Sequence, residues 1–166
     1  MKIRIIGNSG SGKSYWAKKL SKEYNIRHYD LDHIVWNNNS ETYGIKNSQE
    51  NRDEMLNEIL KQDNWIIEGV YYNWCQSTFE QADYILVLQV PRRVYCYRII
   101  KRFFKRKIGL EGGKKESLKS LKELLCWTKK WEKKNWLEIK KLLEDKREKV
   151  VDNPSVICNL LNTFIE

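Results

Sequence analysis

Apolar and polar residues alternate in blocks along the chain, and these blocks predict strands separated by helices. Short runs predict strands at residues 3–6, 27–29, 65–67, 84–90 and 149–151. Apolar residues at helical spacing predict helices over residues 13–24, 49–61, 91–106 and 115–144. Because the run at 84–90 is continuously apolar, it is typical of a sheet that is covered on both faces. The alternation therefore predicts an α/β fold with a parallel sheet and helices on both of its faces.

The same pattern predicts which side chains are buried and where helices begin. The inward faces of the three clearest helices are expected to carry Trp16, Ala17 and Leu20, then Met55, Ile59 and Leu60, then Leu118, Leu121, Leu125, Trp131, Ile139 and Leu143. Pro91 suits the first position of a helix, and Asn153-Pro154 is a start signal for a final one. Glycines at 109, 112 and 113 predict a break between the third and fourth helices.

Length and composition bound the class of protein. The chain has 166 residues, which suits a single domain over residues 1–166, and its 41% hydrophobic content argues against disorder. The sequence has no uninterrupted stretch of 18 or more apolar residues, so we expect no membrane span. Four cysteines lie far apart without a C-x-x-C pair, and are expected to be reduced, mostly buried thiols in a cytoplasmic protein, at positions 75, 96, 126 and 158.

The formal net charge is +9, and the positive charge is concentrated in the second half of the chain. Between residues 92 and 149, lysine and arginine outnumber aspartate and glutamate more than twofold. An excess of this kind indicates anionic partners, such as nucleotides, nucleic acid or acidic surfaces. Solvated faces of long helices would explain most of these lysines.

The most specific motif directly follows the first predicted strand. Residues 7–14 match the phosphate-binding pattern G-x-x-x-x-G-K-[ST], with the members Gly7, Asn8, Ser9, Gly10, Ser11, Gly12, Lys13 and Ser14. The glycines allow close backbone approach, and the helix that follows offers unpaired N–H groups to an anion. Lys13 can reach the β- and γ-phosphates of ATP, and the Ser14 hydroxyl can bind Mg²⁺. A strand before the motif and a helix after it provide the context that such a loop requires.

The chain also resembles a family of P-loop kinases. The stretches IIGNSGSGKS, HYDLDHIVW, WIIEGVYY and VLQVPRRVYCYRIIKRFFKR are similar to those of adenylate-kinase-like proteins labelled DNA topology modulation (FlaR-related). The resemblance implies a P-loop NTPase fold of the nucleoside- and nucleotide-kinase type, a three-layer α/β/α sandwich with a lid. It further implies a five-stranded parallel sheet of order 2-3-1-4-5, with the active site at the carboxyl ends of the strands.

Within WIIEGVY, Glu68 ends a predicted strand and is followed by glycine. Members of the family commonly carry Asp-Gly at this position, where the carboxylate orients Mg²⁺ or its water ligands. The resemblance therefore implies that Glu68 and Ser14 serve the metal. Glutamate reaches one methylene further than aspartate, so a contact through water is an alternative to direct ligation. An ordinary acidic residue at a strand end is the other interpretation.

Within HYDLDHIVW, Asp30 and Asp32 follow a predicted strand. In extended backbone they would point to the same side and could share Mg²⁺ or accept a hydroxyl proton. The resemblance singles out Asp32 and Trp36 as facing the acceptor, where Trp36 can stack on a flat group. A helix cap for Asp32 and core packing for Trp36 stay open. The acceptor-binding helical region is expected at about residues 37–63.

Arginines at positions 98, 102 and 106 line one face of the third predicted helix. Val90-Pro91 followed by Arg98 and Arg102 resembles an adenylate-kinase pattern in which two arginines contact ATP and clamp the transferring phosphate. The resemblance implies that Arg102 stabilises the transition state and Arg98 contacts the nucleotide. The lid is expected at about residues 103–116, where glycines permit movement and lysines can cover phosphate.

These observations predict a kinase that uses ATP and Mg²⁺ and transfers the γ-phosphoryl group to a small acceptor, with Lys13, Asp32, Arg98 and Arg102 as catalytic residues. The acceptor is either a nucleoside monophosphate or a small molecule with a free hydroxyl. Lys46 and Arg52 are the only cations between His33 and Lys61, which favours the hydroxyl acceptor. A nucleic-acid-associated regulator and an ATPase without an acceptor are the alternatives, although the sequence shows no reading motif for nucleic acid.

Overall fold

The computed structural model describes residues 1–37, 45–110 and 117–152. The chain forms two compact units. The first contains Met1–Gly7, Lys13–Leu88 and Glu148–Glu166, and the second contains Asn8–Gly12 and Gln89–Arg147. Of the phosphate-loop residues 7–14, Asn8–Gly12 thus belong to the second unit and the others to the first.

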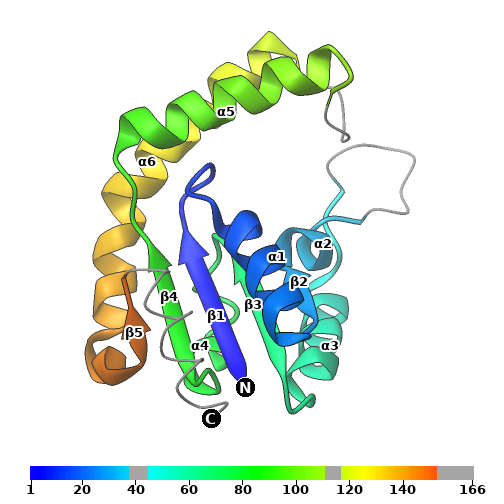
Figure 1. Cartoon of the computed structure of the whole chain (residues 1–166), viewed down its shortest axis with the longest axis vertical. Helices are drawn as coiled ribbons and strands as arrows, with labels where there is room; N and C mark the ends of the chain where they lie inside the picture. Colours follow the sequence, from blue (N-terminus) through cyan, green and yellow to red (C-terminus); the bar gives the residue numbers. More distant parts are fainter. Residues whose placement is uncertain (38–44, 111–116, 153–166) are drawn as a thin grey trace. The chain divides into compact units, whose positions relative to one another are not determined.

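The first unit is built on a five-stranded parallel sheet (Figure 1). Its strands are β1 (Lys2–Gly7), β2 (His28–Asp30), β3 (Trp65–Gly69), β4 (Tyr84–Leu88) and β5 (Val150–Val151). Their order in the sheet is β2-β3-β1-β4-β5, which confirms the predicted parallel sheet of order 2-3-1-4-5. The order places β1, and with it the start of the phosphate loop, in the middle of the sheet.

Burial on both faces explains why the central strands are almost continuously apolar. Ile3 and Ile5 of β1 pack with Ala17 and Leu20 of helix α1 (Lys13–Tyr24), and none of the four is exposed to solvent. The intervening Arg4 points to the opposite face because side chains alternate along a strand, and it too is completely buried. Helix α1 has the bounds and the core positions that the sequence predicts.

Helices α2 (Leu31–Val35), α3 (Gln49–Leu60) and α4 (Ser77–Glu80) also belong to the first unit. Helix α2 corrects the expectation of extended backbone after Asp30, because the Asp30 carboxylate accepts a hydrogen bond from the backbone N–H of Asp32 and so caps a helix. In α3 the prediction that Met55 faces inward is wrong. Its side chain is 38% exposed, and the neighbouring Leu56 is buried instead.

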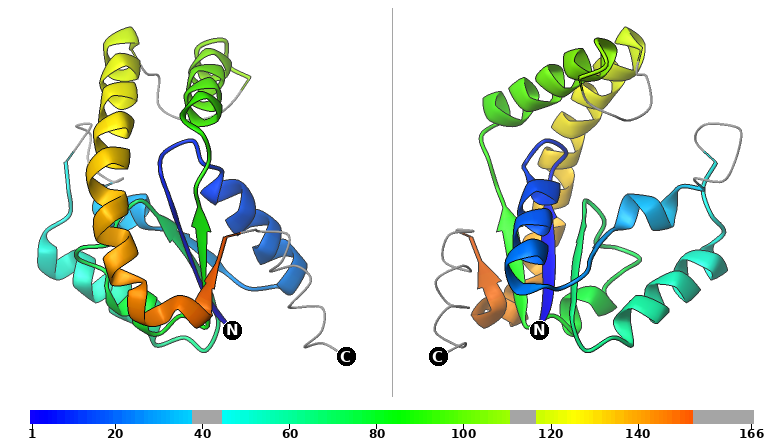
Figure 2. Two further views of the ribbon diagram at one scale, coloured as in Figure 1. Left: turned by 90° about the vertical axis from the view of Figure 1, so that its left-hand side faces the viewer. Right: turned by 45° about the vertical axis from the view of Figure 1, so that its right-hand side comes forward.

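The second unit contains the helices α5 (Arg92–Lys107) and α6 (Leu118–Leu142), which lie side by side (Figure 2). Tyr95, Ile99 and Phe103 form the buried stripe of α5, and the Tyr95 hydroxyl donates a 2.6 Å hydrogen bond to Glu132 of α6. Leu118 is 66% exposed, contrary to prediction, because it lies in the first turn of α6. The 3₁₀ helix η1 (Glu144–Lys149) leads from this unit into β5.

Smaller differences concern helix starts and cysteines. Pro91 is the cap of α5 and Arg92 its first residue, one position later than predicted. Cys75, Cys96 and Cys126 are free thiols, as expected, but only Cys75 is buried. The predicted final helix from Asn153, Cys158, residues 38–44 of the acceptor region and residues 111–116 of the lid lie outside the described residues. Among the described helices, none has the length and apolar character needed to cross a membrane.

Candidate functional site

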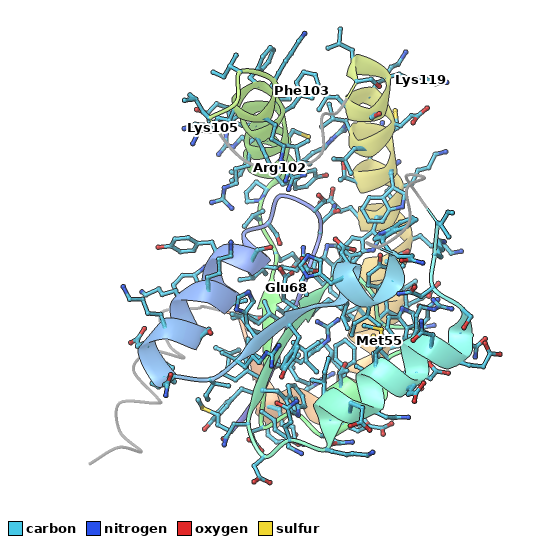
Figure 3. All side chains as sticks on the ribbon, turned by 90° about the vertical axis from the view of Figure 1, so that its right-hand side faces the viewer. Met55, Glu68, Arg102, Phe103, Lys105 and Lys119 are labelled. Atoms are coloured by element: carbon cyan, nitrogen blue, oxygen red, sulfur yellow. The ribbon has the colours of Figure 1, made fainter. Side chains whose placement is uncertain are left out.

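The first unit gathers polar side chains where β1, β2 and β3 end. Ile6 pairs with Gly69 across β1 and β3, and Asp30 pairs with Glu68 across β2 and β3. Parallel strands bring their carboxyl ends to the same edge, which is where ligands bind in open α/β sheets. Figure 3 shows Glu68 at this edge. Residues distant in sequence therefore meet at one place because of the strand order.

Lys13 and Ser14 are the first two residues of α1. Only 8% of Lys13 is exposed. Burial lowers the pKa of its ammonium group, while the negative charges of Glu68 and Asp32 act in the opposite direction. A buried ammonium group interacts strongly with an anion because little water screens its charge, whereas the neighbouring carboxylates offset part of that charge.

Ser14 and Glu68 are in direct contact. The Ser14 hydroxyl donates a 2.5 Å hydrogen bond to Glu68 Oε1, and Glu68 is almost completely buried. A serine hydroxyl and a carboxylate are hard oxygen ligands of the kind that Mg²⁺ prefers, and Mg²⁺ usually takes only one or two protein carboxylates alongside phosphate and water. Within residues 1–37, 45–110 and 117–152 no group of three or more histidines, cysteines or acids forms a metal cage. The pair fits a magnesium ion that shares its coordination with phosphate.

Asp30 adds a second carboxylate to this region. Its pKa is raised from 3.8 to about 6, chiefly by burial and then by the negative charges of Glu68 and Asp32. Crowded carboxylates repel each other, and a divalent cation would relieve that repulsion. The electrostatics therefore agree with a cation site near Glu68.

Asp32 lies in the first turn of α2 and is exposed. The Tyr71 hydroxyl donates a 2.9 Å hydrogen bond to Asp32 Oδ1. The pKa of Tyr71 is raised, first by burial and then by the charge of Asp32. The hydrogen bond occupies one carboxylate oxygen of Asp32, and Tyr71 is a site residue that the sequence analysis missed.

Two tryptophans interact with Tyr71. The Trp36 indole N–H donates to the Tyr71 hydroxyl, and the ring centre of Tyr71 lies 5.9 Å from that of Trp74. A cation also lies over the ring of each tryptophan. Lys46 Nζ lies 5.4 Å from the ring centre of Trp36, and the Arg52 guanidinium carbon lies 5.4 Å from that of Trp74. Trp36 also forms an isolated antiparallel bridge with Lys46, which holds the two together. We call Asp32, Trp36, Tyr71, Trp74 and the two cations the aromatic cluster.

Arg4 is the second residue that sequence analysis missed, because an arginine in a strand is normally exposed. Its guanidinium donates to the carbonyl oxygens of Ile5 at 2.7 Å, Ile67 at 3.2 Å, Gly69 at 3.4 Å and Tyr71 at 2.7 Å. Burial lowers its pKa, and the negative charge of Glu68 opposes this shift. Arg4 thereby fixes the backbone that leads from Glu68 to Tyr71.

In the second unit, residues Asn8–Gly12 have the geometry of an anion-binding loop. Gly10 and Gly12 have φ values of +77° and +105°, and Ser11 between them does not have a positive φ. Such alternation turns successive backbone N–H groups toward one side of the chain. Asn8 closes the turn, because its carbonyl oxygen accepts a 3.1 Å hydrogen bond from Ser11 N–H.

The arginines of α5 occupy different surroundings. Nη1 of Arg98 donates hydrogen bonds to the carbonyl oxygens of Ser11 at 2.8 Å and of Gly10 at 3.4 Å. Arg102 and Arg106 follow at one-turn intervals and are half-buried. Arg102 and Phe103 are labelled on α5 in Figure 3. The structure thus brings Arg98 to the phosphate-loop backbone, while the predicted roles of Arg98 and Arg102 toward ATP stay predictions.

The central β1, the glycine loop after it and the helix that begins with Lys13 and Ser14 define a P-loop NTPase with a kinase-like fold. Residues 3–119 match the family model described as AAA domain, and the chain belongs to this family. Uncharacterized protein YqaC of Bacillus subtilis (strain 168) is 27% identical over 125 residues, which cover 73% of this chain and 68% of YqaC. Membership of the FlaR-related family stays a prediction.

Solved structures support the fold. A shikimate kinase from Acinetobacter baumannii, in complex with shikimate, gives a TM-score of 0.58 at 14% identity and covers 99% of this chain and 92% of that one. An uncharacterized protein from Eubacterium ventriosum gives a TM-score of 0.54 at 16% identity, with 99% and 97% coverage. At these identities the similarity concerns the fold alone.

Proposed function

We propose that the protein is a Mg²⁺-dependent kinase that transfers the γ-phosphoryl group of ATP to a hydroxyl group of a small acceptor. One observation carries this proposal: in the first unit, Lys13, Ser14 and Glu68 lie at the same sheet edge as the Asp32–Tyr71 pair. Phosphate-binding and metal-binding groups therefore occur together with a carboxylate suited to a reacting hydroxyl. An ATPase without an acceptor would instead use such a carboxylate to orient water, so the acceptor dependence of turnover separates the two functions.

Each residue has a role that follows from its chemistry. Lys13 neutralises charge on the β- and γ-phosphates, and Ser14 and Glu68 would hold Mg²⁺, which when bound screens the phosphate charge. Asp32 accepts the hydrogen bond of the acceptor hydroxyl and receives its proton as the oxygen attacks phosphorus. Arg102 would neutralise charge that develops on the transferring group.

The aromatic cluster indicates the kind of acceptor. Tyr71 leaves the second oxygen of the Asp32 carboxylate available for a hydroxyl donor. Lys46 and Arg52 place two positive charges beside the tryptophan rings of this cluster. An acceptor that carries a hydroxyl group together with a carboxylate or phosphate fits these groups best.

The test is a panel of acceptors with Mg²⁺-ATP, read as formation of ADP and of phosphorylated product. The panel contains nucleosides, nucleoside monophosphates, neutral polyols and hydroxy acids, with shikimate among them because of the shared fold. We expect turnover that requires an acceptor and is lost in Lys13→Ala and Arg102→Ala. Lys18→Ala, an exposed lysine of the same helix as Lys13, is the matched control. Unchanged turnover in Lys13→Ala would contradict the assignment of the site.

A nucleic-acid-associated regulator is the second candidate, and α5 favours it. This helix contains no acidic residue and exposes Tyr97 and Phe104, with Lys101 Nζ 5.7 Å from the ring centre of Tyr97. Exposed aromatic rings beside cations are suited to single-stranded nucleic acid. Salt-sensitive binding of an oligonucleotide that persists in Lys13→Ala would support this function. Steady phosphate release with no acceptor effect would instead indicate a simple ATPase.

A further inference from the structure

The middle of the phosphate loop is held by the helices of the second unit. Asn8 Nδ2 donates a 2.9 Å hydrogen bond to the carbonyl oxygen of Thr128 on α6, and Asn8 and Thr128 are both buried. On the other side of the loop, a Cβ atom at Gly10 would lie 2.8 Å from the Tyr95 carbonyl oxygen of α5. Glycine is required here because any side chain would collide with backbone.

Arg98 adds a contact that determines the direction of one peptide group. Its Nη1 atom lies 2.8 Å from the Ser11 carbonyl oxygen, and a Cβ atom at Gly12 would come within 3.3 Å of that nitrogen. The Ser11–Gly12 peptide is trans, so its carbonyl and the Gly12 N–H point in opposite directions. Because the carbonyl faces Arg98, the Gly12 N–H points away from Arg98.

The Gly12 N–H differs from the N–H of its neighbour Ser11, which already donates to the Asn8 carbonyl oxygen. Within the described part of the chain, the Gly12 N–H has no hydrogen-bond acceptor. An amide that is held in one direction and has no internal acceptor is ready to bind an anion without reorganisation.

We propose that Arg98 is a positioning residue of the phosphate loop, which fixes the Ser11–Gly12 peptide so that the Gly12 N–H donates to the polyphosphate of ATP. The proposal rests on the proposed binding of ATP by this loop. It differs from the role that the family resemblance implies, in which Arg98 contacts the nucleotide itself. In our proposal Arg98 acts through the backbone, so its contribution is independent of the base and the ribose.

The first arm of the test needs no ligand. Amide resonances and hydrogen-exchange rates of Ser11 and Gly12 are compared in ¹⁵N-labelled wild type, Arg98→Ala and Arg98→Lys, with Lys101→Ala as the control for loss of one cation from α5. We expect Arg98→Ala to shift the Gly12 resonance and accelerate its exchange, and Arg98→Lys to restore part of both, because lysine retains a donor. Unchanged Gly12 signals in both Arg98 variants would overturn the proposal.

The second arm measures dissociation constants by calorimetry for Mg²⁺-ATP and for Mg²⁺-tripolyphosphate, which has no base or ribose. We expect Arg98→Ala to weaken both by a similar factor of about ten, the loss typical of one charge-assisted hydrogen bond. Weakened binding of ATP with unchanged binding of tripolyphosphate would overturn the proposal in favour of a contact with the nucleoside. If Arg98→Ala does not fold, the same comparison is made with Arg98→Lys, for which we expect a smaller, equal loss for both ligands.

The two proposals fail in distinguishable ways. If wild type binds neither ligand, or if Lys13→Ala binds them as wild type does, the proposed function fails. If wild type binds both ligands and Lys13→Ala binds neither, the site stands, and the Arg98 comparisons alone decide the role of Arg98.

Discussion

The Ser14 hydroxyl and the Glu68 carboxylate are hydrogen-bonded although 54 positions separate them in the chain. The contact exists because Ser14 follows the loop after β1, and β3 pairs directly with β1. A hydroxyl from the start of α1 and a carboxylate from the end of β3 are oxygen ligands of the kind that a hard cation prefers. The pairing of strands, and not sequence proximity, therefore creates the candidate metal site.

Substitution of Glu68 should raise the Mg²⁺ concentration that activity requires and leave the fold intact. Glu68→Gln keeps the size and can still accept from Ser14, but it removes the charge that attracts the metal. We expect the Mg²⁺ concentration for half-maximal ADP formation to rise roughly tenfold to a hundredfold. Glu68→Asp keeps the charge one methylene shorter and should show a smaller rise. A Mg²⁺ titration at saturating ATP checks this, and identical curves for wild type and Glu68→Gln would exclude Glu68 from the metal site.

Tyr71→Phe tests the residue that holds Asp32. The substitution removes only the hydroxyl that donates to Asp32 Oδ1. Loss of a hydrogen bond to a charged group should reduce kcat/KM for the acceptor by about tenfold. The dissociation constant of Mg²⁺-ATP should not change, since the proposed function places Tyr71 at the acceptor and not at ATP. Tyr97→Phe on α5, where the ring is 63% exposed, is the control. An equal loss of ATP affinity in Tyr71→Phe would mean that the hydroxyl has a structural role.

Asp30 predicts a stability effect that depends on pH in the metal-free protein. The pKa of Asp30 is raised from 3.8 to about 6 in the folded state. At a pH where Asp30 is ionised in both the folded and the unfolded protein, this charge therefore lowers the free energy of unfolding. The contribution of Asp30 to stability is therefore most favourable below pH 4 and is lost as pH rises through about 6. Asp30→Asn should stabilise the protein by roughly 2 kcal/mol at pH 8 and have little effect at pH 4.

Urea denaturation in the presence of EDTA measures this difference at each pH. Asparagine also caps helices, so the start of α2 is preserved and the comparison isolates the charge. Addition of Mg²⁺ should reduce the advantage of Asp30→Asn at pH 8, because the cation stabilises the ionised carboxylates of wild type. A constant difference between the two proteins from pH 4 to pH 8 would contradict the electrostatic explanation.

Periodic and short-range signals made much of the fold predictable. The bounds of α1 agree with the sequence analysis, because a clear apolar pattern follows the glycine loop. The strand order also agrees, but it was implied by the family resemblance and not by the apolar pattern. The pattern fails where a single side chain decides the local structure. Asp30 starts α2 through a capping hydrogen bond, and neither apolar periodicity nor strand propensity reports such a contact.

The candidate site was predictable only as far as its motifs extend. Asp32 and Trp36 were singled out by the family resemblance. Tyr71 lies in the matching stretch WIIEGVYY, but the resemblance gave it no role, and Trp74 lies outside the matching stretches. They join the site because β2 and β3 are neighbours, and their loops therefore meet. The role of Arg4 was not predictable for a different reason. Its complete burial depends on carbonyl groups of a segment that is distant in the sequence.

Arg4→Met should therefore affect both stability and the acceptor site. Methionine fills a similar volume but leaves the carbonyl oxygens of Gly69 and Tyr71 buried without the donor they have in wild type. These acceptors belong to the backbone, so an apolar replacement cannot remove them as it can remove a paired side chain. We expect the free energy of unfolding to fall by about 3 kcal/mol, and Tm to fall by roughly 10 °C.

Kinetics of Arg4→Met distinguish a specific effect on the acceptor site from a general loss of stability. At a temperature where the variant is fully folded, KM for the acceptor should rise because the backbone around Tyr71 is no longer fixed, whereas the affinity for Mg²⁺-ATP should be retained. Arg27→Met, an exposed arginine whose guanidinium carbon lies 5.2 Å from the ring centre of Tyr29, should change neither quantity appreciably. Urea denaturation and steady-state kinetics measure the two effects. An Arg4→Met variant as stable as wild type would show that the four carbonyl contacts of Arg4 do not hold the loop in place.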